Sequence, residues 1–303
     1  MVDMSVKIGK LKLKNPVMAG SGTFGTEYGE LLDIKKMGAY VAKTITMRPR
    51  TGNPPPRVAE TPSGMLNSIG LENKGAEYFL KETLTGIKKF DIPVIVSIAG
   101  DDAAEFAELA KRLDKVRGVD AIELNLSCPN IRYGARSHLI AQCDKATAKV
   151  VKKVRKATGK TLIAKLSPNV TDITRIAKSA EDAGADALTV ANTYLGMAVD
   201  IDTKRPMLGN VTGGLSGPAI KPLSLRMVYQ VYKAVKIPII GSGGIMDWKD
   251  AVEFILCGAS ALQIGTATFV NPSASIEIAS GIIAYLRKNK IGSVSKLTGT
   301  VKI

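Results

Sequence analysis

Histidine and cysteine are scarce in this chain of 303 residues, which contains one histidine, His138, and three cysteines. A single histidine argues against a histidine-based catalytic triad and against a multi-histidine metal site, and we expect no metal. Cys128, Cys143 and Cys257 lack metal-ligand spacing, and an odd count argues against a disulfide framework. Unpaired cysteines are typical of a reducing compartment, which indicates the cytoplasm. We expect Cys143 and Cys257 to be core residues.

Long apolar runs are also missing from the sequence. No run approaches the roughly 18 residues that a membrane-spanning helix needs. The first residues, MVDMSVKIGK, contain no apolar signal core. We therefore expect a cytoplasmic protein without a membrane partner.

Acidic residues are fewer than basic ones, with 27 aspartates and glutamates against 42 lysines and arginines, and the formal net charge is +15. Nucleic acid, an acidic protein or anionic ligands would each suit such a charge. The lysines and arginines are nevertheless spread along the chain, without a dense run or interleaved aromatic residues. This spread favours a lysine-rich solvated surface over a nucleic-acid interface.

Short apolar strands alternate with helical segments along the whole chain. The predicted strands are 16–21, 40–46, 93–100, 121–127, 161–167, 187–193, 238–244 and 261–267. The predicted helices are 29–39, 75–90, 102–117, 142–157, 172–183, 223–235, 247–257 and 274–289. Eight such units indicate an α/β fold of the (β/α)₈ TIM-barrel type, with an open doubly wound sheet as the alternative.

Three further features complete the predicted barrel. Residues 5–15 alternate apolar and basic side chains around Gly9, which predicts an N-terminal hairpin that closes one end. Long loops follow the second, fourth and sixth strands. Glycines at 38, 118, 184 and 258 precede strands, where they can take the left-handed conformation that ends a helix. No linker divides the chain, so we expect a single domain, 1–303.

The stretch Ala121–Asn130, AIELNLSCPN, carries the clearest chemical signal. Its apolar residues share one parity and its polar residues share the other, so one face meets a helix layer and the other faces a site. Cys128 follows directly, and Pro129 ends the strand because proline has no N–H to donate. Either Cys128 is a thiol displayed at the strand end, or it is an inert buried cysteine.

Enzymes with this fold place their sites at the carboxyl ends of the strands. Lys43 and Lys165 stand in strands of otherwise small and apolar residues, where an ammonium needs a partner anion. The last two strand ends, around Gly243-Gly244 and Gly265-Thr266, form glycine-rich turns that suit a phosphate. A phosphorylated redox cofactor would explain both the lysines and the shortage of acid–base residues.

Several motifs together resemble the class 1 dihydroorotate dehydrogenases, type 1B. They are NSIGL at 67–71, ELNLSCPN at 123–130, Asn192-Thr193, GGLSGPAIKP at 213–222, GSGGI at 241–245 and Gly265-Thr266. The resemblance runs over nearly the whole chain. It implies a barrel that holds FMN and oxidises dihydroorotate to orotate in pyrimidine synthesis.

The resemblance also assigns roles by position. Cys128 would remove the C5 proton of the substrate while the C6 hydride passes to flavin N5, and cations at Lys43 and Lys165 would stabilise the anionic reduced flavin. The implied FMN contacts are Ser21, Lys43, Thr44, Ser97, Asn125, Lys165, Ala191, Gly217, Gly243, Gly244, Gly265 and Thr266. The implied substrate contacts are Lys43, Asn67, Ser68, Ile69, Gly70, Leu71, Asn125, Asn192 and Thr193.

Two positions depart from the family pattern. Related sequences commonly carry asparagine at the position of Ser97, which leaves that FMN contact in question. The loop after Cys128 contains Arg132 and Arg136 and matches no family pattern. Its arginines either attract the orotate carboxylate or face water.

The type 1B resemblance further implies a partner. This would be a subunit that carries FAD and an iron–sulfur cluster and passes electrons to NAD, in a heterotetramer built around a homodimer of this chain. The sequence itself has neither a cluster cysteine pattern nor a dinucleotide fingerprint.

Three other functions fit parts of the sequence. A tRNA dihydrouridine synthase is also a basic flavin barrel, but it should carry an additional helical RNA-binding domain. A dihydropyrimidine dehydrogenase or a related flavin reductase fits the barrel, although the substrate loops match it less closely. A non-catalytic barrel that binds nucleic acid would show steeply salt-dependent binding without flavin.

Overall fold

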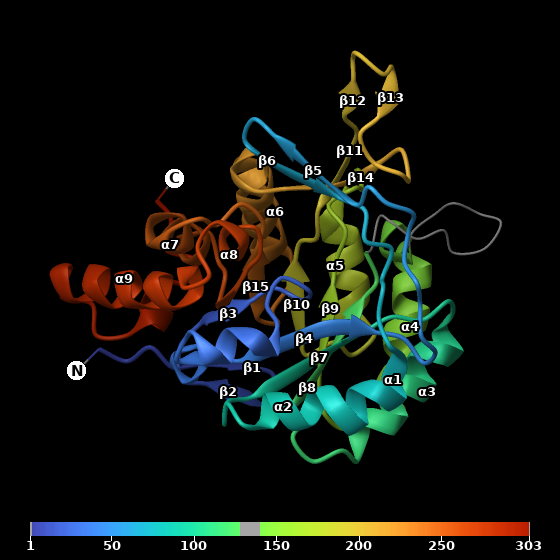
Figure 1. Ribbon diagram of the computed structural model, residues 1–303. Coiled ribbons are helices and arrows are strands. Elements are labelled where there is room, and N and C mark those ends of the chain that lie inside the picture. Colours follow the sequence, from blue (N-terminus) through green and yellow to red (C-terminus); the bar gives the residue numbers. More distant parts are fainter. Residues whose placement is uncertain (1, 128–139, 303) are drawn as a thin grey trace.

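Eight parallel strands form the centre of the molecule (Figure 1). The computed structural model describes residues 2–127 and 140–302. The strands are β3 (Val17–Ala19), β4 (Tyr40–Ile45), β7 (Val94–Ile98), β8 (Ala121–Asn125), β9 (Thr161–Lys165), β10 (Ala187–Val190), β15 (Ile239–Ser242) and β16 (Ala261–Ile264). Each lies within a predicted strand, so all eight predictions are confirmed.

The order of the strands is that of a barrel. Neighbours in the sheet run β3-β16-β15-β10-β9-β8-β7-β4, and the two end strands meet through a parallel bridge between Met18 and Ala39. The Gly38 amide also donates to the Val17 carbonyl at 2.8 Å. The prediction of a (β/α)₈ barrel is confirmed, and the open doubly wound sheet is excluded.

The N-terminal hairpin is present and closes one end of the barrel. Strands β1 (Val6–Ile8) and β2 (Leu11–Leu13) pair antiparallel. Ile8 and Leu13 are fully buried against inward-facing residues of the barrel strands, including Ile163. The hairpin therefore supplies an apolar floor to the barrel.

The helices form the outer layer around the sheet (Figure 1). They are α1 (Gly75–Tyr78), α2 (Leu84–Lys88), α3 (Ala103–Asp114), α4 (Asp144–Arg155), α5 (Ile173–Asp182), α6 (Lys221–Ala234), α7 (Trp248–Leu256), α8 (Ala267–Val270) and α9 (Ala274–Lys288). Several helices have an aspartate as the N-cap residue. For example, Asp102 accepts hydrogen bonds from two amides at the start of α3, and Asp247 does the same for α7.

Two helix predictions need correction. The segment 29–39 forms no α-helix but two short 3-10 helices, Thr26–Glu30 and Ile34–Lys36. Its buried residues Ile34 and Met37 lie three apart, as in a 3-10 turn, while Leu31 is 76% exposed. The segment 75–90 is interrupted by a π-helical turn, Phe79–Thr83, between α1 and α2.

The loops after β4 and β10 contain strands that the sequence analysis missed. β5 (Val58–Thr61), β6 (Gly64–Asn67), β14 (Gly213–Ser216) and β11 (Tyr194–Gly196) form one antiparallel sheet, hereafter the upper sheet. Figure 1 shows the upper sheet over one end of the barrel, with the ribbon β12 (Val199–Asp200) and β13 (Arg205–Pro206) projecting beyond it. Because its pairing joins segments far apart in the chain, local sequence patterns do not reveal it.

Three of the four glycines expected to be left-handed behave as predicted. Gly118, Gly184 and Gly258 have φ values of +89°, +101° and +118°. Gly38 does not; a Cβ there would lie 2.2 Å from the Asn15 carbonyl oxygen, so close packing explains this glycine.

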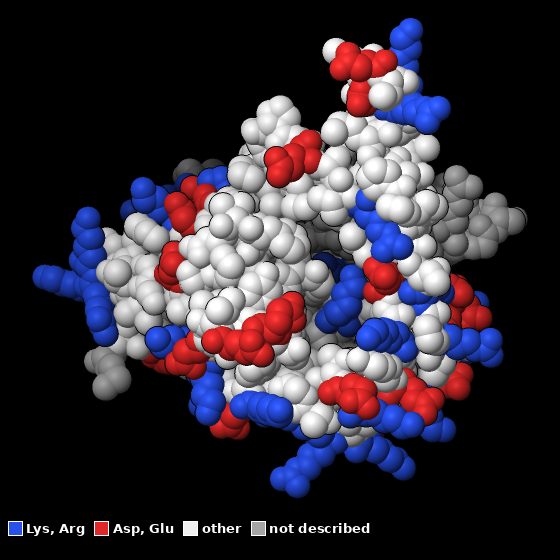
Figure 2. Space-filling view, viewed as in Figure 1, with Lys and Arg blue, Asp and Glu red and all other residues white. Residues whose placement is uncertain are grey.

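The surface charge is dispersed. Figure 2 shows basic and acidic side chains intermixed over the face in view, which agrees with a solvated lysine-rich surface. Cys143 is exposed at the start of α4 and Cys257 is half-buried, so the prediction that both are core residues is wrong for Cys143. Among the described residues no helix is long and apolar enough to cross a membrane.

Candidate active site

A cavity lies at the carboxyl ends of the barrel strands, beneath the upper sheet. Its volume is about 230 Å³. Most of the predicted contacts line it: Ser21, Lys43, Thr44, Asn67, Ile69, Gly70, Leu71, Asn125, Lys165, Ala191, Asn192, Thr193, Gly243, Gly244, Gly265 and Thr266. The structure thus gathers residues from across the sequence around one volume, as strand-end geometry requires.

Three predicted contacts are not among the residues that line the cavity. Ser97 is fully buried, and its hydroxyl group is 2.9 Å from the Thr44 hydroxyl. Ser68 is also fully buried, and it accepts a hydrogen bond from Asn53 Nδ2 at 2.8 Å. Gly217, with a φ of +95°, follows the lining residue Ser216. Their roles in binding FMN or substrate stay predictions.

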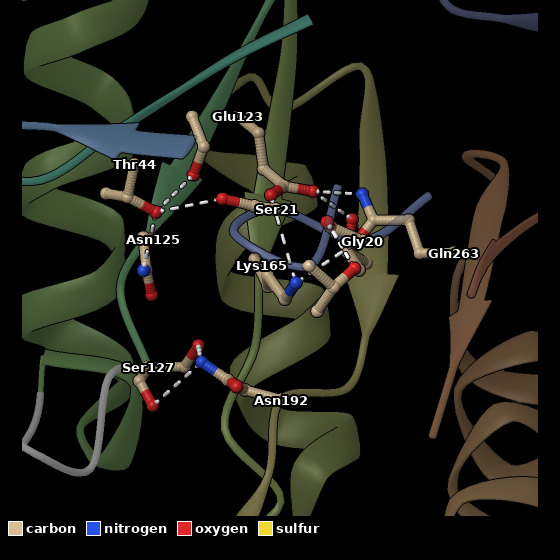
Figure 3. Close-up of polar contacts among 12 residues, drawn as sticks. Gly20, Ser21, Thr44, Glu123, Asn125, Ser127, Lys165, Asn192 and Gln263 are labelled. Atoms are coloured by element: carbon tan, nitrogen blue, oxygen red, sulfur yellow. Dashed lines mark hydrogen bonds and ion pairs between the residues drawn. The ribbon is translucent and has the colours of Figure 1, made fainter. Parts of the chain in front are cut away.

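A chain of hydroxyl groups supports one wall of the cavity (Figure 3). Thr44 Oγ1 lies 3.1 Å from Ser21 Oγ and accepts a hydrogen bond from Asn125 Nδ2 at 3.1 Å. Asn125 Oδ1 is buried and has no hydrogen-bond partner among the described residues. A buried amide oxygen without a partner is costly, so this atom is available to a ligand donor.

The floor of the cavity contains a second polar group. Lys165 Nζ donates to Gln263 Oε1 at 3.0 Å and lies 3.9 Å from Glu123 Oε1. Gln263 Nε2 donates to Glu123 Oε2 at 2.6 Å. Figure 3 shows these three side chains meeting within the barrel, where only Lys165 reaches the cavity lining.

Glycine turns close the opposite wall. Gly243 and Gly244 have φ values of +123° and +78°. A Cβ at Gly244 would lie 2.6 Å from the Lys221 backbone nitrogen, so both conformation and space demand glycine here. Gly265 differs, because a Cβ there would meet only Thr23 Cγ2, at 3.9 Å. The missing side chain at Gly265 leaves room for a ligand to approach the backbone.

Hydrogen bonds hold two of the predicted substrate contacts, Asn192 and Asn67, in position. Asn192 Nδ2 donates to Ser127 Oγ at 3.1 Å, which ties β10 to the residue before Cys128. Asn67 donates to the Gly214 carbonyl in the upper sheet at 3.3 Å. Cys128 itself, with His138 and the predicted loop residues Arg132 and Arg136, lies outside the described residues.

Sequence reasoning placed Glu123 on the face of its strand that meets the site but assigned it no role, and it missed Gln263. Both signals were available, since each is a polar residue in an apolar strand. Each also shares its parity with a predicted contact, Asn125 or Gly265, two positions further along. Two lining residues from the upper sheet, Val58 and Met65, carried no such signal, because long-range strand pairing brings them there.

The arrangement suits a polar, anionic ligand. Among the described residues that line the cavity, the charged ones are Lys43 and Lys165, and both are cations. Amide and hydroxyl groups supply directional hydrogen bonds, and glycine backbone approaches from one side. No cluster of potential metal ligands occurs in the described part of the chain.

Comparisons with known proteins agree with this geometry. The family model described as dihydroorotate dehydrogenase matches residues 3–286. Similar curated proteins carry the name "Dihydroorotate dehydrogenase B (NAD(+)), catalytic subunit". The protein of Thermoanaerobacter sp. strain X514 is 51% identical over 304 residues, with all of both chains covered. That of Bacteroides thetaiotaomicron is 50% identical over 305 residues, again with full coverage. That of Geotalea daltonii is 52% identical over 304 residues and 99% of each chain.

Proposed function

The chain belongs to the dihydroorotate dehydrogenase family, and from this premise we propose how its cavity oxidises dihydroorotate to orotate as the catalytic subunit of an NAD-linked enzyme. The reaction is a step of pyrimidine synthesis. One observation carries the mechanism: the strand-end residues that the family resemblance assigned to FMN and substrate lie around one cavity.

The residues present fit FMN. Its phosphate requires backbone N–H groups and a hydroxyl group, which the turns at Gly243-Gly244 and Gly265-Thr266 offer without side chains in the way. Its ring requires donors and positive charge, which Lys43 and Lys165 supply. When bound, FMN supplies a hydride acceptor.

The protein residues have separate tasks in this mechanism. The Cys128 thiolate takes the C5 proton of dihydroorotate. Asn67 and Asn192 present amides, each of which can both donate to and accept from a pyrimidine edge. The upper sheet covers the cavity and excludes water, which strengthens the electrostatic contacts of Lys43 and Lys165. Ser97 acts behind the lining by orienting the Thr44 hydroxyl.

Anaerobic absorbance spectroscopy tests this function directly. The purified protein should be yellow, and dihydroorotate should bleach the flavin absorbance. A yellow protein that dihydroorotate does not bleach would retain the cofactor but refute the substrate. A colourless protein that cannot be reconstituted with FMN would refute the assignment of the cavity.

We further propose a partner subunit that carries FAD and an iron–sulfur cluster, in a heterotetramer around a homodimer of this chain, located in the cytoplasm. The support is the word "subunit" in the names of the relatives and the family resemblance. Tandem-affinity purification from native cells should recover this partner, with NAD reduction only in its presence. Full NAD reduction by this chain alone would contradict the proposal.

A further inference from the structure

Glu123 is a fully buried carboxylate beneath the cofactor cavity, and the mechanism above does not use it. Its side chain is 0% exposed. Oε2 accepts hydrogen bonds from Thr189 Oγ1 at 2.8 Å and Gln263 Nε2 at 2.6 Å. Oε1 has no hydrogen-bond partner in the described part of the chain, and Lys165 Nζ lies 3.9 Å from it. These contacts join β8, β9, β10 and β16 across the barrel interior.

The geometry defines the orientation of the Gln263 amide. A carboxylate can only accept hydrogen bonds and an ammonium can only donate them. Gln263 therefore directs its nitrogen to Glu123 and its oxygen to Lys165, at 2.6 and 3.0 Å. Reversing the amide would break both bonds. Glu123 thereby fixes the position of Lys165 through Gln263 as well as through its own charge.

Burying the Glu123 carboxylate at this position costs free energy that a compensating interaction must offset. Removing an ion from water costs several kcal/mol, and an isolated buried charge is neutralised instead. Below Glu123 the barrel is apolar, with Ala121 and Ile163 fully buried. Above it, the described lining of the cavity contains two cations and no carboxylate. The only nearby negative charge for Lys165 among the described residues is thus Glu123.

We propose that Glu123 is a positioning residue for this reaction: acting through Gln263, it holds the Lys165 ammonium group in place at the cofactor cavity, and so determines how strongly the reduced cofactor is stabilised. The proposal rests on the proposed binding of FMN. With FMN bound, Lys165 would stabilise the negative charge of the reduced cofactor, and Glu123 supplies a counter-charge to Lys165 within the barrel. The buried pair therefore keeps a cation in the lining of the cavity.

The test is the midpoint potential of bound FMN, measured by anaerobic spectroelectrochemical titration against a reference dye. Glu123→Gln keeps the side-chain volume and removes the charge. We expect Lys165 to lose the contacts that hold it at the cavity, so the reduced-to-oxidised ratio at a fixed applied potential should fall about tenfold or more, the equivalent of about 1.4 kcal/mol. Lys165→Met should produce a similar fall.

The double variant separates positioning from general stability. If Glu123 acts through Lys165, the potential of Glu123→Gln/Lys165→Met should equal that of Lys165→Met alone, because Glu123 then has no lysine left to position. Additive shifts would overturn the proposal. An unchanged or higher potential in Glu123→Gln would also overturn it, since Lys165 would then stay in place without the carboxylate.

A matched control and a second variant complete the test. Asp186→Asn removes a carboxylate that pairs with Arg155 at the opposite end of β10, at 2.8 Å. It should lower the melting temperature and leave the potential unchanged. If Glu123→Gln does not fold, Gln263→Met tests the same link without a change of charge, and an unchanged potential would refute the bridge. If the unaltered protein does not bind FMN, that result would instead refute the proposed function.

Discussion

The two ends of the barrel interior are formed by the same strands but differ in polarity: one end is apolar and the other is polar. Within each strand, residues two positions apart face the same side. The hairpin end is lined by Ile95, Ala121, Ile163, Ala187 and Ala261. Two positions further along the same strands stand Ser97, Glu123, Lys165, Thr189 and Gln263. The interior thus changes from apolar to polar over roughly 7 Å, at about 3.3 Å per residue.

This difference shows how one fold separates stability from chemistry. The apolar layer and the hairpin exclude water from below, so the polar layer operates at low dielectric. Burying polar and charged groups in this layer costs desolvation free energy, and the described charges in it occur as a pair. Substitutions at the two ends should therefore affect different measurements.

The largest effect is expected from substitution of Cys128, the proposed catalytic base. If Cys128 takes the C5 proton, kcat of Cys128→Ala with dihydroorotate should fall by about 10²–10⁴-fold. FMN absorbance and melting temperature should stay as in the unaltered protein. The exposed Cys143→Ala is the control and should keep full activity. Stopped-flow bleaching measures both, and an equal rate in Cys128→Ala would remove the cysteine from the mechanism.

The next effect tests the apolar end. Ile163 is fully buried in the floor of the barrel. Ile163→Ala should lower the free energy of unfolding by about 2–5 kcal/mol, through lost burial and the cavity that remains. Denaturant titration measures this loss. The midpoint potential of bound FMN should not move; a shift as large as that of Lys165→Met would show that the two ends are not separate.

A smaller effect, on the affinity for FMN, is expected at Gly265, where the absence of a side chain leaves space in the cavity. Gly265→Val places a side chain in the cavity without a clash, because a Cβ there has open space around it. The affinity for FMN should fall about tenfold or more, near 1.4 kcal/mol, while the fold is retained. Gly159→Val, at an exposed site with nothing within 4 Å of its Cβ, is the control. Flavin fluorescence quenching gives both dissociation constants, and equal values would contradict the placement of FMN.

The smallest effect lies outside the barrel interior. Asp102 accepts hydrogen bonds from the amides of Glu105 and Ala104, which lower the pKa of its carboxyl group. Asp102→Ala should destabilise the protein by about 1 kcal/mol, a typical value for a helix N-cap. Because the folded pKa is the lower one, this stabilisation is present above the unfolded pKa near about 3.9 and is lost as the pH falls through the folded pKa.

Thermal unfolding of Asp102→Ala and of the unaltered protein from about pH 2 to about pH 7 measures that dependence. The difference in stability should be constant near neutral pH and shrink in acid. A difference that is independent of pH would show that the carboxylate charge does not contribute to the cap.

Local patterns predicted most of the barrel. Strand parity placed Ile122 and Leu124 against the helices and Asn125 towards the cavity, as the structure has them. The segment 29–39 was predicted wrongly, because a few apolar residues three or four apart fit both an α-helix and 3-10 turns. Ser97 and Ser68 have the parity and the position of contacts, yet their hydroxyl groups bond to neighbouring side chains behind the lining.

The sequence by itself determined the eight-fold alternation of strand and helix, the hairpin, and the set of residues at the strand ends, because these follow from periodicity and from short motifs. Tertiary structure decided the rest. The upper sheet pairs segments about 150 positions apart, as in Met65 with Ser216. The link from Glu123 to Lys165 through Gln263 also joins distant positions. Such contacts depend on barrel closure and register, which no local pattern encodes.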